Sequence, residues 1–318
     1  MAFTITDGGI ETALTERLGQ ELPEFAAFVL LGTDEGRAAL REYYRPFLEI
    51  AATTGTPIVL DTPTWRANPD WGAALGYDAL GLARVNAEAV ALTRECAREF
   101  GAGATVQIGG CVGPRFDDWV AEQRMTADAA EGYHAPQVRA LAGAGVDRIT
   151  AVTMQDAAEA TGIVRAARTF GVPVVVSFTV GADGLLADGD TLGEAIHSVD
   201  VATGGYASGF LVNCAHPSEA ATAIEVTPGW HDASSLAVSE IQTVDGAKTL
   251  ADRLIGFRLN AAVHGDDGPG DAPEAFAAGV ASLRALAPAA HTFGGCCGTD
   301  APHIAALAAA LSARSEWP

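Results

Sequence analysis

The chain has 318 residues, of which 49% are apolar, and 40 acidic against 19 basic residues give it a formal net charge of -21. This length and apolar content allow one large core, and we expect a single domain over residues 1–318. The negative charge excludes nucleic acid and anionic membrane surfaces as expected partners. The first residues, MAFTITDGGIETAL, have no basic segment followed by an apolar run, and the sequence has no run of ~18 apolar residues that could span a bilayer, so we expect a cytoplasmic protein.

Short β-branched runs alternate with helical stretches along the chain, a pattern typical of repeated βα units. Strands are predicted at 3–6, 57–65, 104–113, 148–154, 173–180, 209–214, 253–263 and 291–298. Helices are predicted at 34–55, 80–100, 127–144, 157–170, 192–204, 236–251, 272–286 and 301–312. Residues 7–12 are predicted to form a loop, and 218–252 has the weakest pattern, with a divergent strand as the alternative there. Eight such strands favour an α/β fold, the closed (β/α)8 TIM barrel.

Five cysteines are too few and too unevenly spaced for a secreted disulfide framework. Cys96 lies in a helical pattern and is predicted to be an inert core thiol. Cys111 is predicted to be a small apolar filler, with a place in the lining of the pocket at the barrel mouth as the alternative. Cys214 ends the sixth predicted strand, whereas Cys296 and Cys297 end the eighth. Functional groups of such barrels gather at the C-terminal ends of the strands, so we expect these three thiols to share one site.

Adjacent cysteines on a regular strand point to opposite faces, so both can reach one ion only where the backbone turns sharply. Gly294, Gly295 and Gly298 flank the pair and supply that freedom. A tripod of thiolates suits Zn²⁺ and leaves a fourth position open. A buried dithiol, a vicinal disulfide and a closed structural zinc site are the alternatives, although the short Cys-x2-Cys spacing of a structural site is missing.

Such an open position would allow a thiol to bind, lose its proton and attack an electrophilic methyl group. Three thiolates leave a zinc ion with a net charge of about -1, which favours a cationic methyl donor such as a sulfonium or a quaternary ammonium ion. The expected partners are therefore a small-molecule thiol and a small-molecule methyl donor. Whether the protein forms a homo-oligomer is left open by the sequence.

Three blocks of sequence resemble the motifs of the homocysteine S-methyltransferase family: DGGIETAL after the first strand, LVNC ending the sixth and FGGCCGTDAPHI ending the eighth. Their order and spacing match over nearly the whole chain. The resemblance implies a zinc-dependent barrel that moves a methyl group from S-methylmethionine, S-adenosylmethionine or another sulfonium to a small thiol. For homocysteine the product is methionine.

The same resemblance implies roles for individual residues. The zinc ligands would be Cys214, Cys296 and Cys297. The polar end of the thiol would be held by Asp7 and the amides around Gly8 and Gly9, the site would be oriented by Asn213, and Asn260 falls where the family has an asparagine on the seventh strand.

One position departs from the family. After the fourth strand the family has a Glu-Thr pair whose carboxylate meets the amino group of homocysteine, and this chain has Val152 there. A valine cannot pair with an ammonium group. Either Gln155, Asp156 or Glu11 substitutes for the missing carboxylate, or the acceptor thiol is not homocysteine.

The second predicted strand continues into TPTWRANPDW, whose Trp65 and Trp71 are candidates for an aromatic wall around a methylated cation, with core or lid packing as the ordinary alternative. Arg66 is a candidate for holding a carboxylate. Two further hypotheses remain beside the favoured methyltransferase. The same zinc chemistry could serve a different thiol or demethylate another donor, or the protein could bind zinc or thiols without turnover.

Overall fold

The computed structural model describes residues 3–117, 124–230, 241–243, 246–265, 268 and 270–313. Eight parallel strands close into a barrel in the order β1-β10-β9-β6-β5-β4-β3-β2. Their bounds are β1 Thr4–Thr6, β2 Ile58–Asp61, β3 Val106–Val112, β4 Arg148–Met154, β5 Val174–Phe178, β6 Gly209–Asn213, β9 Leu254–Leu259 and β10 Thr292–Gly295. The predicted (β/α)8 barrel is confirmed, with each of these strands inside a predicted strand.

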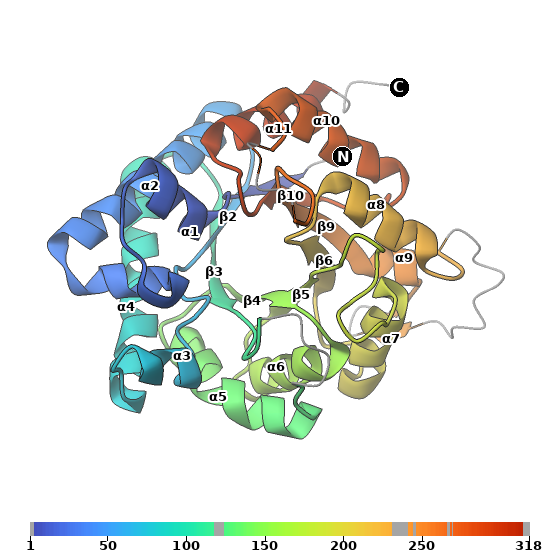
Figure 1. Ribbon diagram of the computed structural model, residues 1–318, viewed down its shortest axis with the longest axis horizontal. Coiled ribbons are helices and arrows are strands. Elements are labelled where there is room, and N and C mark those ends of the chain that lie inside the picture. Colours follow the sequence, from blue (N-terminus) through green and yellow to red (C-terminus); the bar gives the residue numbers. More distant parts are fainter. Residues whose placement is uncertain are drawn as a thin grey trace.

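Helices surround the barrel on its outer side (Figure 1). The longer ones are α2 Asp34–Thr54, α4 Ala79–Phe100, α5 Ala127–Gly143, α6 Ala157–Thr169, α7 Leu192–Thr203, α8 Pro217–Val226, α10 Pro273–Ser282 and α11 Ala301–Ala313. The shorter ones are α1 Ile10–Thr12, η1 Ala13–Arg17, η2 Pro23–Phe25, η3 Ala27–Gly32, α3 Pro69–Ala74, α9 Leu250–Arg253 and η4 Leu283–Ala285. Within the described ranges, no helix combines the length and the apolarity needed to cross a membrane.

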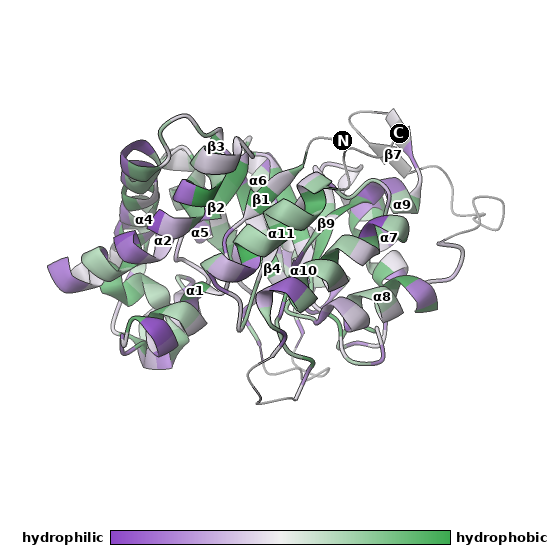
Figure 2. Ribbon diagram, turned by 90° about the horizontal axis from the view of Figure 1, so that it is seen from above, coloured by the Kyte–Doolittle hydropathy of each residue, from purple (hydrophilic) through white to green (hydrophobic). Residues whose placement is uncertain are grey.

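Local sequence explains where the main helices begin and end. The Thr33 side chain accepts a hydrogen bond from the Gly36 amide at the start of α2, and Asp78 caps α4 in the same way. α2 ends at Gly55, whose φ of 68° is the left-handed conformation that favours glycine. All residues of β5 and β6 are buried, as parallel strands covered on both faces require, and Figure 2 shows apolar strands inside a more polar outer surface.

The predicted helix over 236–251 is wrong over most of the residues that the structure describes. The strands β7 Ile241–Thr243 and β8 Gly246–Lys248 pair antiparallel there, and the prediction is correct only at residues 250–251, which begin α9. Gly246 has a φ of 108°, which a helix interior does not allow. Residues 236–240 lie outside the described part of the chain. The helix of this region is α8, which the sequence analysis missed. The predicted loop at 7–12 likewise ends early, because α1 begins at Ile10.

Candidate metal and substrate site

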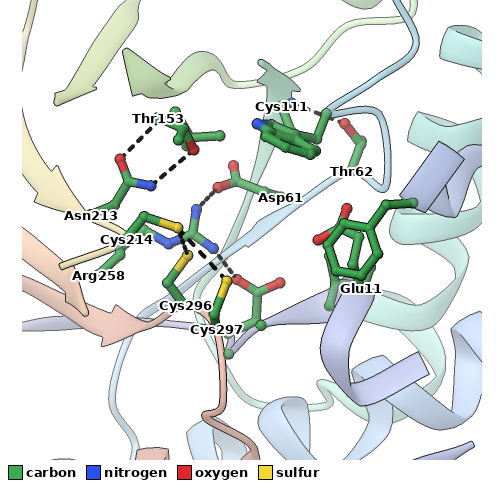
Figure 3. Close-up of a pocket in the computed structure, with 17 residues that line it drawn as sticks. Glu11, Asp61, Thr62, Cys111, Thr153, Asn213, Cys214, Arg258, Cys296 and Cys297 are labelled. Atoms are coloured by element: carbon green, nitrogen blue, oxygen red, sulfur yellow. Dashed lines mark hydrogen bonds and ion pairs between the residues drawn. The ribbon is translucent and has the colours of Figure 1, made fainter. Parts of the chain in front are cut away.

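Three cysteine side chains meet just beyond the C-terminal ends of β6 and β10 (Figure 3). The Sγ atom of Cys214 lies 3.1 Å from that of Cys296 and 3.7 Å from that of Cys297. All three sulfurs lie within 4.8 Å of one another, and the three residues are half-buried. The predicted juxtaposition of Cys214 with the Cys296-Cys297 pair is therefore present.

Strand β9 holds this cluster together, because it lies between β6 and β10 in the barrel. The backbone amide of Cys214 donates to the carbonyl of Arg258 at 3.2 Å. The amide of Cys296 donates to the carbonyl of Leu259, the next residue of the same strand, at 2.8 Å. Two consecutive carbonyls of β9 thus align cysteines that are far apart in the sequence.

The backbone reaches this arrangement through two tight conformations. Cys214 has a φ of 53°, an unusual value for a residue with a side chain, and Gly298 has a φ of 73°. Of the three glycines predicted to give the backbone conformational freedom around the cysteine pair, only Gly298 has a positive φ. Gly294 is required for a different reason, because a Cβ atom there would lie 1.8 Å from the Thr6 hydroxyl oxygen.

The three thiols differ in pKa because of the hydrogen bonds among them. Hydrogen bonds with Cys214 and Cys297 lower the pKa of Cys296 well below its ordinary value, and nearby Arg258 lowers it further. The pKa of Cys214 is raised well above its ordinary value, chiefly by its hydrogen bonds to the same two partners. Cys296 is therefore the thiol that most readily becomes a thiolate, the form that binds metals.

A buried ion network lies beside the cysteines. Arg258 on β9 pairs with Asp7 Oδ1 at 2.7 Å and also with Asp61 at the end of β2. The Tyr43 hydroxyl donates to Asp7 Oδ2 at 3.2 Å. Burial raises the pKa of Asp7 to about 7, although Arg258 opposes this shift. Asp7 was predicted, but Arg258 and Asp61 were missed; charged residues inside buried strand sequences were the available signal.

Asn213 joins the ends of β4 and β6. Its Oδ1 accepts a hydrogen bond from the Thr153 amide at 2.9 Å, and its Nδ2 donates to the Thr153 hydroxyl at 3.1 Å. Thr153 has a φ of 62°, which is strained for a β-branched residue. The two hydrogen bonds hold this conformation next to Cys214.

These elements enclose one pocket at the barrel mouth, which we call the mouth pocket. It is lined by Asp7, Gly8, Gly9, Ile10, Glu11, Phe25, Asp61, Thr62, Trp65, Cys111, Val152, Thr153, Asn213, Cys214, Arg258, Cys296 and Cys297. Most residues predicted to bind substrate are in this set. Asn260 is not: its amide donates to the Ala215 carbonyl, and its buried Oδ1 has no hydrogen-bond partner.

The candidates for replacing the missing carboxylate are not equivalent. Val152 lines the mouth pocket, but Gln155 and Asp156 do not. Asp156 caps α6 and pairs with Arg124 at 2.8 Å. Glu11 alone among the three suggested substitutes lines the pocket.

Arg66 is also absent from the pocket lining. Its guanidinium pairs with Asp117 and stacks on Trp71, with its central carbon 3.9 Å from the ring centroid. The suggestion that Arg66 holds a substrate carboxylate therefore finds no support, and Trp71 packs against Arg66.

A family model described as homocysteine S-methyltransferase matches residues 4–311. This chain belongs to the homocysteine S-methyltransferase family. No curated protein matches the chain.

Solved structures of a family member have the same fold. The homocysteine methyltransferase MmuM from Escherichia coli in its metallated form is 22% identical, with a TM-score of 0.72 over 97% of this chain and 96% of that one. The oxidized form of the same enzyme is 20% identical, with a TM-score of 0.71 over 98% of this chain and 96% of that one. At this level of identity the likeness concerns the fold.

The three thiols fit a metal ion chemically. Each offers one soft sulfur ligand, and the sulfurs lie within 4.8 Å of one another at the edge of the mouth pocket. Among the residues described, this is the one group of three or more cysteine, histidine or acidic side chains that could hold a metal. A set of three ligands that faces a pocket is typical of catalytic rather than structural sites.

Proposed function

We propose that the protein is a zinc-dependent S-methyltransferase. It moves a methyl group from a sulfonium donor, S-methylmethionine or S-adenosylmethionine, to a small thiol, with homocysteine giving methionine as the principal reaction. The observation that carries the proposal is the convergence of Cys214, Cys296 and Cys297 on one point at the wall of the mouth pocket. Membership of the family supports thiol methylation in general.

The metal would be held by the three cysteine thiolates. When bound, zinc would supply a positive charge that lowers the pKa of the acceptor thiol. Arg258 offsets the negative charge of the neighbouring carboxylates and lies close enough to Cys296 to lower the pKa of that thiol. The hydrogen bonds from Asn213 to Thr153 keep the adjoining backbone in place.

The mouth pocket suits a cationic methyl donor. Trp65 and Phe25 line it and present aromatic surface, which attracts sulfonium and quaternary ammonium groups. During transfer the acceptor sulfur forms a bond to the methyl carbon while the bond between that carbon and the donor sulfur breaks. The electron pair goes to the donor sulfur, which leaves as a neutral sulfide, and the thiol proton is released to solvent.

The first test measures zinc content and methyl transfer in wild type, Cys297→Ala and the control Cys96→Ala. Cys96 is a fully buried thiol of α4, away from the pocket lining. We expect near-stoichiometric zinc and methionine formation in wild type and in the control, and loss of both in Cys297→Ala. Absence of zinc in all three proteins would refute the proposal.

A second candidate is the same chemistry with a thiol other than homocysteine, or demethylation of another methylated donor. Val152 favours it, because this apolar side chain lines the pocket where the family has a carboxylate. Zinc binding without methionine formation, followed by methylation of another member of a thiol panel, would favour this candidate. Zinc binding with no turnover of any thiol or donor would indicate a binding protein. The single-domain organisation, cytoplasmic location and oligomeric state stay predictions.

A further inference from the structure

Three carboxylates line the mouth pocket, and two of them already have a cation. Asp7 pairs with Arg258 at 2.7 Å, and Asp61 pairs with the other end of the same guanidinium. Within the described ranges, no arginine, lysine or histidine forms an ion pair with the third carboxylate, Glu11. Asp61 keeps one oxygen, Oδ1, without a hydrogen-bond partner, but its charge is balanced by Arg258. Among the described residues, Glu11 is therefore the carboxylate of this pocket whose charge is not balanced by an ion pair.

The opposite wall offers no such partner. The end of β4 contributes Val152, which is apolar, and Thr153, whose hydroxyl accepts a hydrogen bond from Asn213. An ammonium group placed against this wall would lose hydration without gaining a charged partner, which is unfavourable. A charged amino group in this pocket must therefore turn away from β4.

Glu11 lies where such a group can reach it. Figure 3 shows Glu11 extending from α1 on the far side of the pocket from Cys214 and Cys296. Gly9, two residues before Glu11, is packed so tightly on Cys296 that a Cβ atom there would lie 2.5 Å from the Cys296 carbonyl oxygen. Glu11 and the three cysteines line the same pocket, so a ligand whose sulfur sits at the cysteines shares that pocket with the Glu11 carboxylate.

The electrostatic setting agrees with this placement. Burial raises the pKa of Glu11 to about 7; a backbone hydrogen bond lowers it, the charges of Cys296 and Asp7 raise it further, and Arg258 lowers it to a smaller extent. Glu11 is half-buried, and a carboxylate with other negative charges nearby is stabilised in its charged form when a cation binds. Phe25 and Trp65 line the same pocket and add apolar aromatic surface to it.

We propose that Glu11 is a specificity-determining residue that binds the ammonium group of an amino-acid thiol, in place of a carboxylate at the end of β4. This inference rests on the proposed thiol methylation. The sulfur would lie at the three cysteines and the ammonium group at α1. The chain would then accept homocysteine despite Val152, holding its amino group on the other side of the pocket.

The test compares two acceptors that differ by one group. The probes are L-homocysteine and 4-mercaptobutyrate, which is homocysteine without its amino group. The zinc-loaded proteins are wild type, Glu11→Gln and the control Glu16→Gln, which changes an exposed side chain. Dissociation constants are measured by calorimetry, and KM and kcat are measured with saturating S-methylmethionine. We expect Glu11→Gln to raise Kd and KM for homocysteine about 10- to 100-fold, as for loss of a charged hydrogen bond, and those for 4-mercaptobutyrate less than about 3-fold. Glu16→Gln should change neither.

Several results would overturn the inference. Equal weakening of both thiols by Glu11→Gln would assign Glu11 a structural role. An effect confined to the KM of S-methylmethionine, measured separately with saturating homocysteine, would assign Glu11 to the methyl donor. Wild type that binds 4-mercaptobutyrate as tightly as homocysteine would show that no ammonium site exists. If homocysteine binds in a Glu11-dependent way but is never methylated, the proposed function fails and the inference about Glu11 stands.

Discussion

Replacing Arg258 by methionine should destabilise the protein strongly, because it removes the side chain that forms the ion pairs with both Asp7 and Asp61. Arg258 is 8% exposed, and its partners Asp7 and Asp61 are 2% and 5% exposed. Breaking a buried ion pair by removing one partner costs about 3–5 kcal/mol, since the remaining charge has no compensation. Here two carboxylates lose their partner, so we expect the upper part of that range at pH 8. A typical domain has a free energy of unfolding of about 5–15 kcal/mol.

The loss of stability caused by Arg258→Met should increase as the pH rises. The folded-state pKa of Asp7 is already raised to about 7, above its unfolded value. A proton retained by the folded state contributes stability at low pH, and this contribution is lost as the pH rises through the folded pKa. Without Arg258 that pKa rises further, so stability continues to fall above pH 7 in the variant but levels off in wild type. The difference should widen by about 1 kcal/mol between pH 7 and pH 8.

Urea unfolding at pH 6, 7 and 8, followed by circular dichroism, measures this effect. A chelator is present throughout, so that metal binding does not contribute to the measured stability. Adding Asp7→Asn and Asp61→Asn to Arg258→Met should recover most of the loss, because the buried charges are then removed together. The control is Arg253→Met, which breaks the buried ion pair with Asp200 outside the pocket. Adding Asp7→Asn and Asp61→Asn to this variant should not recover its stability. A loss below about 1 kcal/mol with no widening above pH 7 would refute the reasoning.

Three further results are expected. Asn213→Ala should lower the free energy of unfolding by about 1–3 kcal/mol, because Thr153 loses the two hydrogen bonds that hold its φ of 62°. Urea unfolding measures this loss beside that of the control Thr222→Ala on α8. Equal losses in the two variants would contradict the prediction. Removal of zinc by a chelator should lower the melting temperature of wild type, since a ligand that binds the folded state stabilises that state. The melting temperature of Cys297→Ala should not change. An equal decrease in both proteins would place the metal elsewhere. The ratio of the Kd of homocysteine to that of 4-mercaptobutyrate should fall as the pH rises through about 7, because the Glu11 carboxyl loses its proton there. In Glu11→Gln, calorimetry should give a ratio that does not change with pH. A ratio independent of pH in wild type would contradict the assignment of Glu11 to the ammonium group.

Much of the architecture was readable from the sequence because its signals are local. Apolar β-branched runs such as PVVVSFTV, with helix caps and terminal glycines between them, predicted eight βα units. The cysteine cluster was also predictable, because Cys214 and the Cys296-Cys297 pair directly follow the strands that bring them to the barrel mouth. The hairpin at 241–248 was not, because its residues fit a helical pattern until Gly246 adopts a positive φ.

Only the tertiary structure decided which charges face one another inside the barrel. Arg258 is 251 residues from Asp7 and 197 from Asp61, and no local pattern connects them. Closure of the barrel brings β9 across from β1 and β2, and desolvation then forces the buried charges to pair. The availability of Glu11 follows from that pairing, because Asp7 and Asp61 share the one guanidinium that lines the pocket. Composition and motifs determined the kind of chemistry, and the fold determined which carboxylate is left to meet a ligand.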